Sequence, residues 1–117
     1  MKAVTTLDEL EGSWRRCVIK FNGIRLLLDQ KYSHCLGRTN AGHGIGLAFL
    51  VRGFSFDVAI HSVEDTHPAT SVGLSVFRPD KNGEWYDDAY IGGLPIGSIY
   101  IPSETEMIDL KFNSGAI

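Results

Sequence analysis

The chain has 117 residues, of which 44% are hydrophobic and 21% charged, and its formal net charge is −3. These values are typical of a single globular domain over residues 1–117 and exclude wholesale disorder. No apolar run approaches the roughly 18 residues of a membrane span, and the first residues do not form a secretory signal, so we expect a cytoplasmic protein without a membrane partner.

The charges are unevenly distributed along the chain. Residues 1–52 hold eight Lys or Arg and four Asp or Glu, a balance of +4, whereas residues 53–117 hold three and ten, a balance of −7. The negative total disfavours a nucleic-acid partner, because phosphate binding requires clustered Lys and Arg. An acidic half suits a basic protein partner, and an ordinary solvated surface is the alternative.

A short N-terminal helix is predicted by a capping box and by helical spacing. Thr6 and Glu9 stand three residues apart, as the N-cap and N3 positions of a capping box do. Three apolar side chains then follow at i, i+3 and i+7: Leu7, Leu10 and Trp14. The helix is expected over about residues 7–15, since Gly12 weakens its far end.

A β-hairpin is predicted next, around Asn22-Gly23. This dipeptide favours a type I′ turn, whose two central residues need positive φ. Pairing Phe21 with Ile24 places six apolar residues on one face: Cys17, Ile19, Phe21, Ile24, Leu26 and Leu28. A helix over residues 24–36 also fits the apolar spacing, but the hairpin accounts for more residues and uses the turn.

The strongest pattern spans residues 45–60, which we interpret as two strands meeting at Arg52-Gly53. Alternate residues of a strand point to one face, and all eight such positions here are apolar: Ile45, Leu47, Phe49, Val51, Phe54, Phe56, Val58 and Ile60. A one-residue slip would expose this set, so burial fixes the register. The preceding residues 33–44, with three glycines and two histidines, are expected to form a loop.

Further strands are predicted at residues 72–77, 84–92, 98–101 and 107–112, with a turn at residues 78–83. Tight turns between successive strands favour sequential antiparallel pairing. The predicted fold class is therefore α+β and mostly β. We expect an antiparallel, strongly curved sheet, either an open barrel or a sandwich, of about seven strands with one short N-terminal helix.

Histidine, cysteine and carboxylate side chains are the candidates for metal binding or catalysis. Seven of them could be combined: His34, His43, His61, His67, Cys35, Asp57 and Asp65. Zinc takes such ligands, but HxH, HExxH and CxxC spacings are absent. Asp57 and His61 lie four residues apart on one strand, roughly 13 Å, which is too far for a direct hydrogen bond. We therefore expect no metal, no cofactor and no catalytic residue.

The candidate binding site is a set of residues that we call the aromatic–acidic cluster. It consists of three aromatic and four acidic residues in one stretch: Asp80, Glu84, Trp85, Tyr86, Asp87, Asp88 and Tyr90. Strand alternation puts Tyr86, Asp88 and Tyr90 on one face and Trp85 and Asp87 on the other. Aromatic residues are enriched at interface hot spots, and acids around them suit a basic partner. In the alternative interpretation one face packs into the core and the acids keep an edge strand soluble.

These observations favour a non-catalytic binding protein over an enzyme. The lead hypothesis is a small cytoplasmic inhibitor, similar in role to an immunity protein or antitoxin, that neutralises a toxin or other enzyme by occluding it. The alternative is a small-molecule-binding β-barrel or a small enzyme that uses a His/Cys/Asp site. A homo-oligomer that pairs exposed sheet edges is a third possibility.

Overall fold

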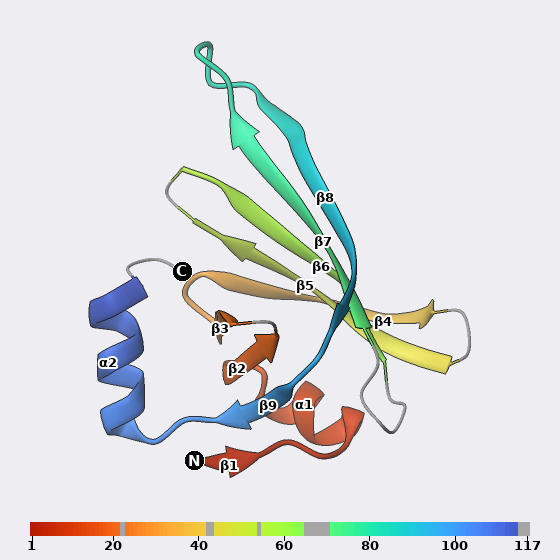
Figure 1. The fold of residues 1–117 in the computed structure, drawn as a ribbon, viewed down its shortest axis with the longest axis vertical. Coiled ribbons are helices and arrows are strands. Elements are labelled where there is room, and N and C mark those ends of the chain that lie inside the picture. The colour runs from red at the N-terminus through yellow and green to blue at the C-terminus, as the bar shows by residue number, and fades with distance from the viewer. Residues whose placement is uncertain (22, 42–43, 54, 65–70, 115–117) are drawn as a thin grey trace.

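In a computed structural model, the described residues of the chain form two antiparallel β-sheets and two helices (Figure 1). The structure describes residues 1–21, 23–41, 44–53, 55–64 and 71–114. The helices are α1 (Leu7–Ser13) and α2 (Glu104–Ser114), and the strands are β1 (Lys2–Ala3), β2 (Arg16–Phe21), β3 (Ile24–Asp29), β4 (Ser33–Ala41), β5 (Gly44–Arg52), β6 (Asp57–Glu64), β7 (Ser71–Pro79), β8 (Trp85–Pro95) and β9 (Ser98–Ile101). The prediction of a mostly β, antiparallel fold is confirmed.

The strands are divided between a small sheet, in the order β1-β9-β2-β3, and a large sheet, in the order β4-β5-β6-β7-β8. The predicted strong curvature, the open barrel and the count of about seven strands are wrong, since the described residues form nine strands in two open sheets. The alternative prediction of a sandwich agrees with the packing of these two sheets around one core. The chain leaves the large sheet after β8, and the Gly97 N–H donates to the Lys20 carbonyl at 2.9 Å. This bend inserts β9 between β1 and β2, so the meander does not continue around into a barrel.

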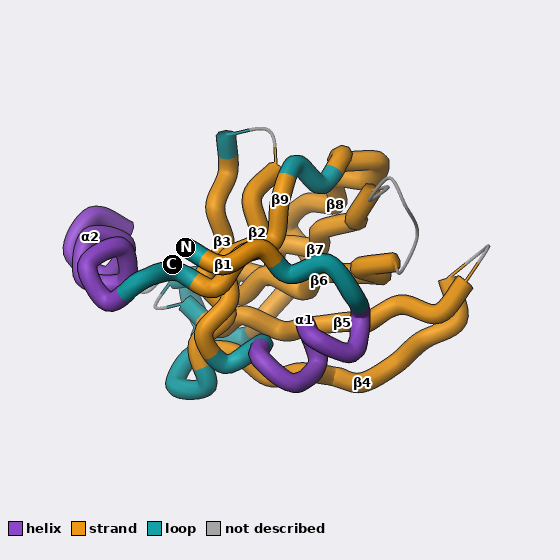
Figure 2. Tube along the Cα trace, turned by 90° about the horizontal axis from the view of Figure 1, so that it is seen from below, coloured by secondary structure: helices purple, strands orange, loops and turns teal. Residues whose placement is uncertain are grey.

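The N-terminal helix forms as its capping signal predicts. Thr6 is the N-cap, and its hydroxyl accepts a hydrogen bond from the Glu9 N–H at 3.1 Å. Leu7 and Leu10 are buried, and α1 lies along β5 (Figure 2). The helix ends at Ser13 rather than near residue 15, because β2 begins at Arg16.

The β2–β3 hairpin has the predicted register, with Phe21 opposite Ile24 and every pair outward to Arg16 opposite Asp29. Gly23 has φ of +78°, as a primed turn requires. The alternative helix over residues 24–36 is wrong. Five of the six predicted inward residues are buried, and Ile24, next to the turn, is exposed.

The β4 strand contradicts the prediction of a loop over residues 33–44. Its residues from Ser33 to Ala41 pair with β5, and the register shifts at a bulge between Cys35 and Gly37. Gly37 has φ of +111°, a conformation that glycine adopts without strain. A polar, glycine-containing segment can therefore serve as an edge strand, which needs pairing on only one side.

The β5–β6 hairpin buries most of the predicted apolar face: Leu47, Phe49, Val51, Val58 and Ile60 are buried. Phe56 is half-buried, and Phe54 lies outside the described residues. The prediction that Ile45 is buried is wrong, since its side chain is 50% exposed at the end of β5 away from the hairpin turn. The connection is longer than Arg52-Gly53, because Arg52 pairs with Asp57 and the Gly53 N–H donates to the Phe56 carbonyl.

A bulge in β6 changes the alternation beyond Ile60. The register shifts between Leu47 and Phe49, so that two residues of β6 lie opposite Ala48. One of these is Ser62, which has φ of +61°. After the bulge Val63 is buried in the core in place of Ser62.

The second helix, α2, replaces the predicted strand at residues 107–112. Ser103 caps it, because its hydroxyl accepts from the Glu106 N–H at 3.3 Å and donates to the Glu106 carboxylate at 3.2 Å. Met107 and Leu110 pack with Val18 and Tyr100 on the small sheet. Neither α1 nor the described part of α2 is long and apolar enough to cross a membrane.

The two sheets and α1 share one core. Phe49 is fully buried in this core, with its ring centroid 6.3 Å from that of Trp14. The small sheet contributes Cys17, Ile19, Phe21, Leu26 and Leu28, and the large sheet contributes Leu47, Phe49, Val51, Val58, Ile60, Val63, Val72 and Leu74. The inner face of the large sheet is therefore covered by the small sheet and α1.

Phe49→Ala is expected to lower the free energy of unfolding by about 3–5 kcal/mol, because it leaves a cavity in this core. The matched control is Ile45→Ala on the same strand, whose side chain is half exposed and whose loss should stay below about 1 kcal/mol. Urea unfolding followed by circular dichroism measures both values. Equal losses for the two variants would contradict the assigned core.

Candidate functional site

The aromatic–acidic cluster lies on the β7–β8 hairpin, which extends away from α2 and the small sheet (Figure 1). Its aromatic residues are all exposed: Trp85 by 49%, Tyr86 by 46% and Tyr90 by 67%. Every residue of β8 is exposed except Leu94, which is half-buried. The interpretation in which one face of this strand packs into the core is therefore wrong.

Asp80 organises the turn between β7 and β8. Its carboxylate accepts hydrogen bonds from the backbone N–H groups of Asn82, at 2.7 Å, and Glu84, at 3.0 Å. The Asp80 N–H donates to the Glu84 carbonyl at 2.7 Å, and Gly83 has φ of +81°. Asp80 thus holds the turn together, in agreement with the turn chemistry predicted for residues 78–83.

A bulge decides which cluster residues share a face. The register of β7 against β8 shifts between Val76 and Phe77, because Asp88 is an extra residue in β8. Trp85, Asp87 and Tyr90 therefore lie on the face that points away from the core, opposite Pro79, Phe77 and Ser75. The predicted grouping of Tyr90 with Tyr86 is wrong for this reason.

Tyr90 lies over a floor of small residues on this outer face. A Cβ atom at Gly73 would lie 2.6 Å from the Tyr90 hydroxyl oxygen, and one at Gly92 would lie 3.1 Å from its ring. The Tyr90 and His61 ring centroids are 6.1 Å apart. Sequence reasoning missed this arrangement, although the glycines at 73 and 92 were its visible signal, since strand glycines mark a close approach.

The acids of the cluster differ in their pairing. The Asp88 carboxylate accepts from Arg78 Nε at 2.7 Å, and the Arg78 guanidinium lies 5.2 Å from the Phe56 ring centroid. Asp87 and Glu84 form no ion pair with any residue that the structure describes. The cluster therefore presents two uncompensated carboxylates beside its exposed aromatic rings.

The predicted alternative site of His, Cys and Asp residues is not assembled in the described ranges, where no three such side chains come together. His43, Asp65 and His67 lie outside those ranges. His61 Nε2 is 2.8 Å from the Ser75 hydroxyl oxygen, a hydrogen bond between neighbouring strands. Ser75 is nearly buried, and His34 lies on β4, separated from His61 by the whole of β5.

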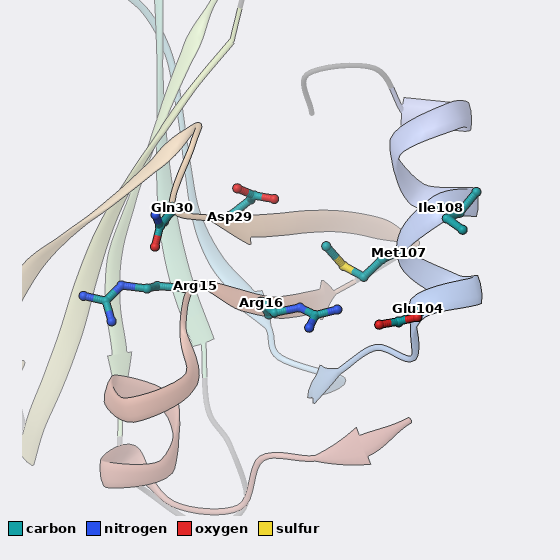
Figure 3. A pocket seen from close by; sticks show the side chains of 7 residues that line it. All are labelled: Arg15, Arg16, Asp29, Gln30, Glu104, Met107 and Ile108. Carbon is teal, nitrogen blue, oxygen red and sulfur yellow. The ribbon is translucent and has the colours of Figure 1, made fainter.

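An open hollow of about 570 Å³ lies beside α2 and shares no lining residue with the cluster (Figure 3). It is lined by Arg15, Arg16, Asp29, Gln30, Glu104, Met107 and Ile108. Two arginines and two carboxylates balance in charge, and the lining contains no histidine or thiol. This composition assembles neither a nucleophile with a base nor a set of metal ligands.

Cys17 is a buried thiol rather than a reactive one. Its sulfur donates a hydrogen bond to the Ser13 carbonyl at 3.1 Å, and burial raises the pKa of the Cys17 thiol to about 11. A raised pKa keeps the thiol protonated, whereas nucleophilic attack requires the thiolate. Both Cys17 and Cys35 are free.

The Cys17 pKa predicts a loss of stability in alkali. The folded thiol ionises near pH 11 and the unfolded thiol near its ordinary pKa of 9.0, so the unfolded state loses this proton first. The contribution of the thiol is complete below pH 9 and disappears as the pH rises toward 11. Urea unfolding at pH 8, 9, 10 and 11 should show a steeper decline for the wild type and Cys35→Ala than for Cys17→Ala. Parallel declines for all three would contradict this assignment.

Asp80→Ala is expected to lower the free energy of unfolding by about 1–2 kcal/mol, because two backbone N–H groups lose their acceptor. The matched control is Glu84→Ala in the same turn, whose carboxylate accepts no hydrogen bond from the described backbone of the turn and whose loss should stay within about 0.5 kcal/mol. Thermal unfolding measures both. A loss for Glu84→Ala as large as that for Asp80→Ala would contradict the turn assignment.

No protein-family model, curated protein sequence or solved structure matches the chain. The exposed residues and their chemistry are therefore the basis of the functional proposal.

Proposed function

We propose that this chain is a non-catalytic protein-binding domain that recognises a basic protein through the aromatic–acidic cluster. Its role would be that of a small inhibitor, similar to an immunity protein or antitoxin, which neutralises a toxin or other enzyme by occluding it. The observation that carries the proposal is the exposure of Trp85, Tyr86 and Tyr90 beside the unpaired carboxylates of Glu84 and Asp87.

Exposed aromatic side chains of this size support an interface. Aromatic residues supply most hot spots, since they bury a large area at low cost in side-chain entropy. Here three occur on one strand that the core of the protein does not cover. Clustering on one hairpin distinguishes them from surface hydrophobic residues scattered singly, which need no explanation.

The charge of the cluster supports a basic partner. The hairpin residues 78–90 contain four carboxylates against Arg78 and Lys81, and Arg78 is already paired with Asp88. Negative potential around an aromatic centre accelerates the encounter with a positively charged surface and disfavours acidic competitors. A cytoplasmic location is part of the proposal, since both thiols are free and reducing compartments keep them so.

The proposal is tested by affinity capture from the source cell with paired variants. Trp85→Ala and Asp87→Lys alter the cluster, whereas Ile108→Ala and Asp109→Lys make similar changes at exposed positions of α2. A basic protein should be captured by the wild type and both α2 variants and lost by both cluster variants. Trp85→Ala should weaken binding about 30-fold or more, as hot-spot truncations do.

Mass spectrometry and quantitative binding with the captured protein give the readout. Unchanged capture by Trp85→Ala and Asp87→Lys would remove the cluster from consideration. Capture lost only by the α2 variants would move the binding site to the opposite end of the molecule.

A further inference from the structure

The outer edge of β8 is open. β8 is the last strand of the large sheet, and among the described residues only β7 pairs with it. It has eleven residues, with no proline before Pro95. An unpaired edge presents a row of backbone N–H and C=O groups that can pair with another strand.

The opposite edge of the same sheet is protected differently. There β4 is interrupted by the bulge at Cys35–Gly37, and Arg38 forms ion pairs with Asp8 and Glu11 of α1. A helix held beside an edge strand hinders edge pairing. β8 also contains a bulge, at Asp88, but its described residues form no ion pair with a helix, so the two edges of this sheet are not equivalent.

The turn hydrogen bonds show which backbone groups of β8 face outward. The Asp80 N–H donates to the Glu84 carbonyl, so Asp80 and Glu84 are a hydrogen-bonded pair. Such pairs alternate with non-hydrogen-bonded pairs along an antiparallel ladder. The pair of Pro79 and Trp85 is therefore non-hydrogen-bonded, in agreement with the missing N–H of proline.

The same alternation continues for two more residues before the bulge. Arg78 and Tyr86 form a hydrogen-bonded pair, and Phe77 and Asp87 a non-hydrogen-bonded one. The N–H and C=O groups of Trp85 and Asp87 consequently point to the open edge, two residues apart. This spacing matches the groups that an added antiparallel strand would present.

The charges on the edge argue against a second copy of this chain. The regular part of β8 is limited to residues 85–87, because the bulge follows at Asp88. Two copies paired antiparallel through the outward groups of Trp85 and Asp87 would have their two-fold axis at Tyr86. Glu84 of one copy would then lie opposite Asp88 of the other, and like charges in directly opposite positions are destabilising.

We infer that an extended, basic strand of the partner pairs with the open edge of β8 through the outward backbone groups of Trp85 and Asp87. This inference rests on the proposed function and adds the mode of binding. Main-chain hydrogen bonds would supply affinity, and Lys or Arg side chains on the outer face of the added strand would meet Asp87. Trp85 and Tyr90 would pack against the aliphatic parts of those side chains.

The test uses Asp87→Pro and Asp87→Ala as a matched pair. Both remove the carboxylate, but only proline removes the outward N–H, and neither breaks a hydrogen bond to β7. The probe is a blocked octapeptide of alternating Lys and Thr, and its control replaces each Lys with Glu. Nuclear magnetic resonance titration of ¹⁵N-labelled protein gives both the affinity and the residues affected.

The Lys–Thr peptide should shift the amide signals of residues 85–91, and the Glu–Thr peptide should not. Asp87→Pro should bind the Lys–Thr peptide about fivefold more weakly than Asp87→Ala, the effect of one lost hydrogen bond. If Asp87→Pro fails to fold, Trp85→Pro against Trp85→Ala tests the same idea at the other outward position. Equal affinities within a pair, or shifts centred away from β8, would overturn the inference.

Two further outcomes also overturn it and are distinguishable. Self-association of the wild type in light scattering, abolished by Asp87→Pro but retained by Asp87→Ala, would assign the edge to a second copy. If Trp85→Ala loses the captured partner while Asp87→Pro and Asp87→Ala bind that partner equally, the proposed function stands and only strand addition fails.

Discussion

The fold depends on one constraint, which is that the apolar inner face of the large sheet must be covered. β2, β3 and α1 provide this cover, and their side chains join those of β5, β6 and β7 in a single core around Phe49. The cover is limited in extent, because β2 and β3 have six residues each whereas β8 has eleven. The hairpin that extends past the cover keeps its aromatic residues in water, since nothing in the described structure lies over them.

The candidate site is thus a consequence of unequal sheet sizes as much as of its own residues. If the core covered β8, Trp85 or Tyr86 would be buried, but both side chains are exposed. The bulge at Asp87–Asp88 then brings Trp85, Asp87 and Tyr90 to one face, where Tyr90 lies over Gly73. Aromatic surface, uncompensated acids and an open edge therefore occur on the same strand.

Local signals in the sequence predicted the elements that local chemistry determines. Asn22-Gly23 gave the right hairpin register, Thr6 the right cap, and alternation most of the core residues. The errors have physical reasons: β4 is a polar edge strand, and the strand predicted at residues 107–112 is a helix because Ser103 and Glu106 form a capping pair before it. Bulges in β6 and β8 place Val63 and Tyr90 on the faces opposite to those that strict alternation predicts. The pairing of β9 with the small sheet is not encoded in the spacing of apolar residues.

The position of β9 between β1 and β2 has a consequence for synthesis on the ribosome. β2 and β3 can pair as soon as both have emerged, but the other side of β2 has to wait for Ser98–Ile101. β1 depends on the same late segment, since Lys2 pairs with Ile101. The β2–β3 hairpin thus remains an incomplete sheet until more than 60 further residues have been translated. During that interval the unpaired edge of β2 is accessible to chaperones.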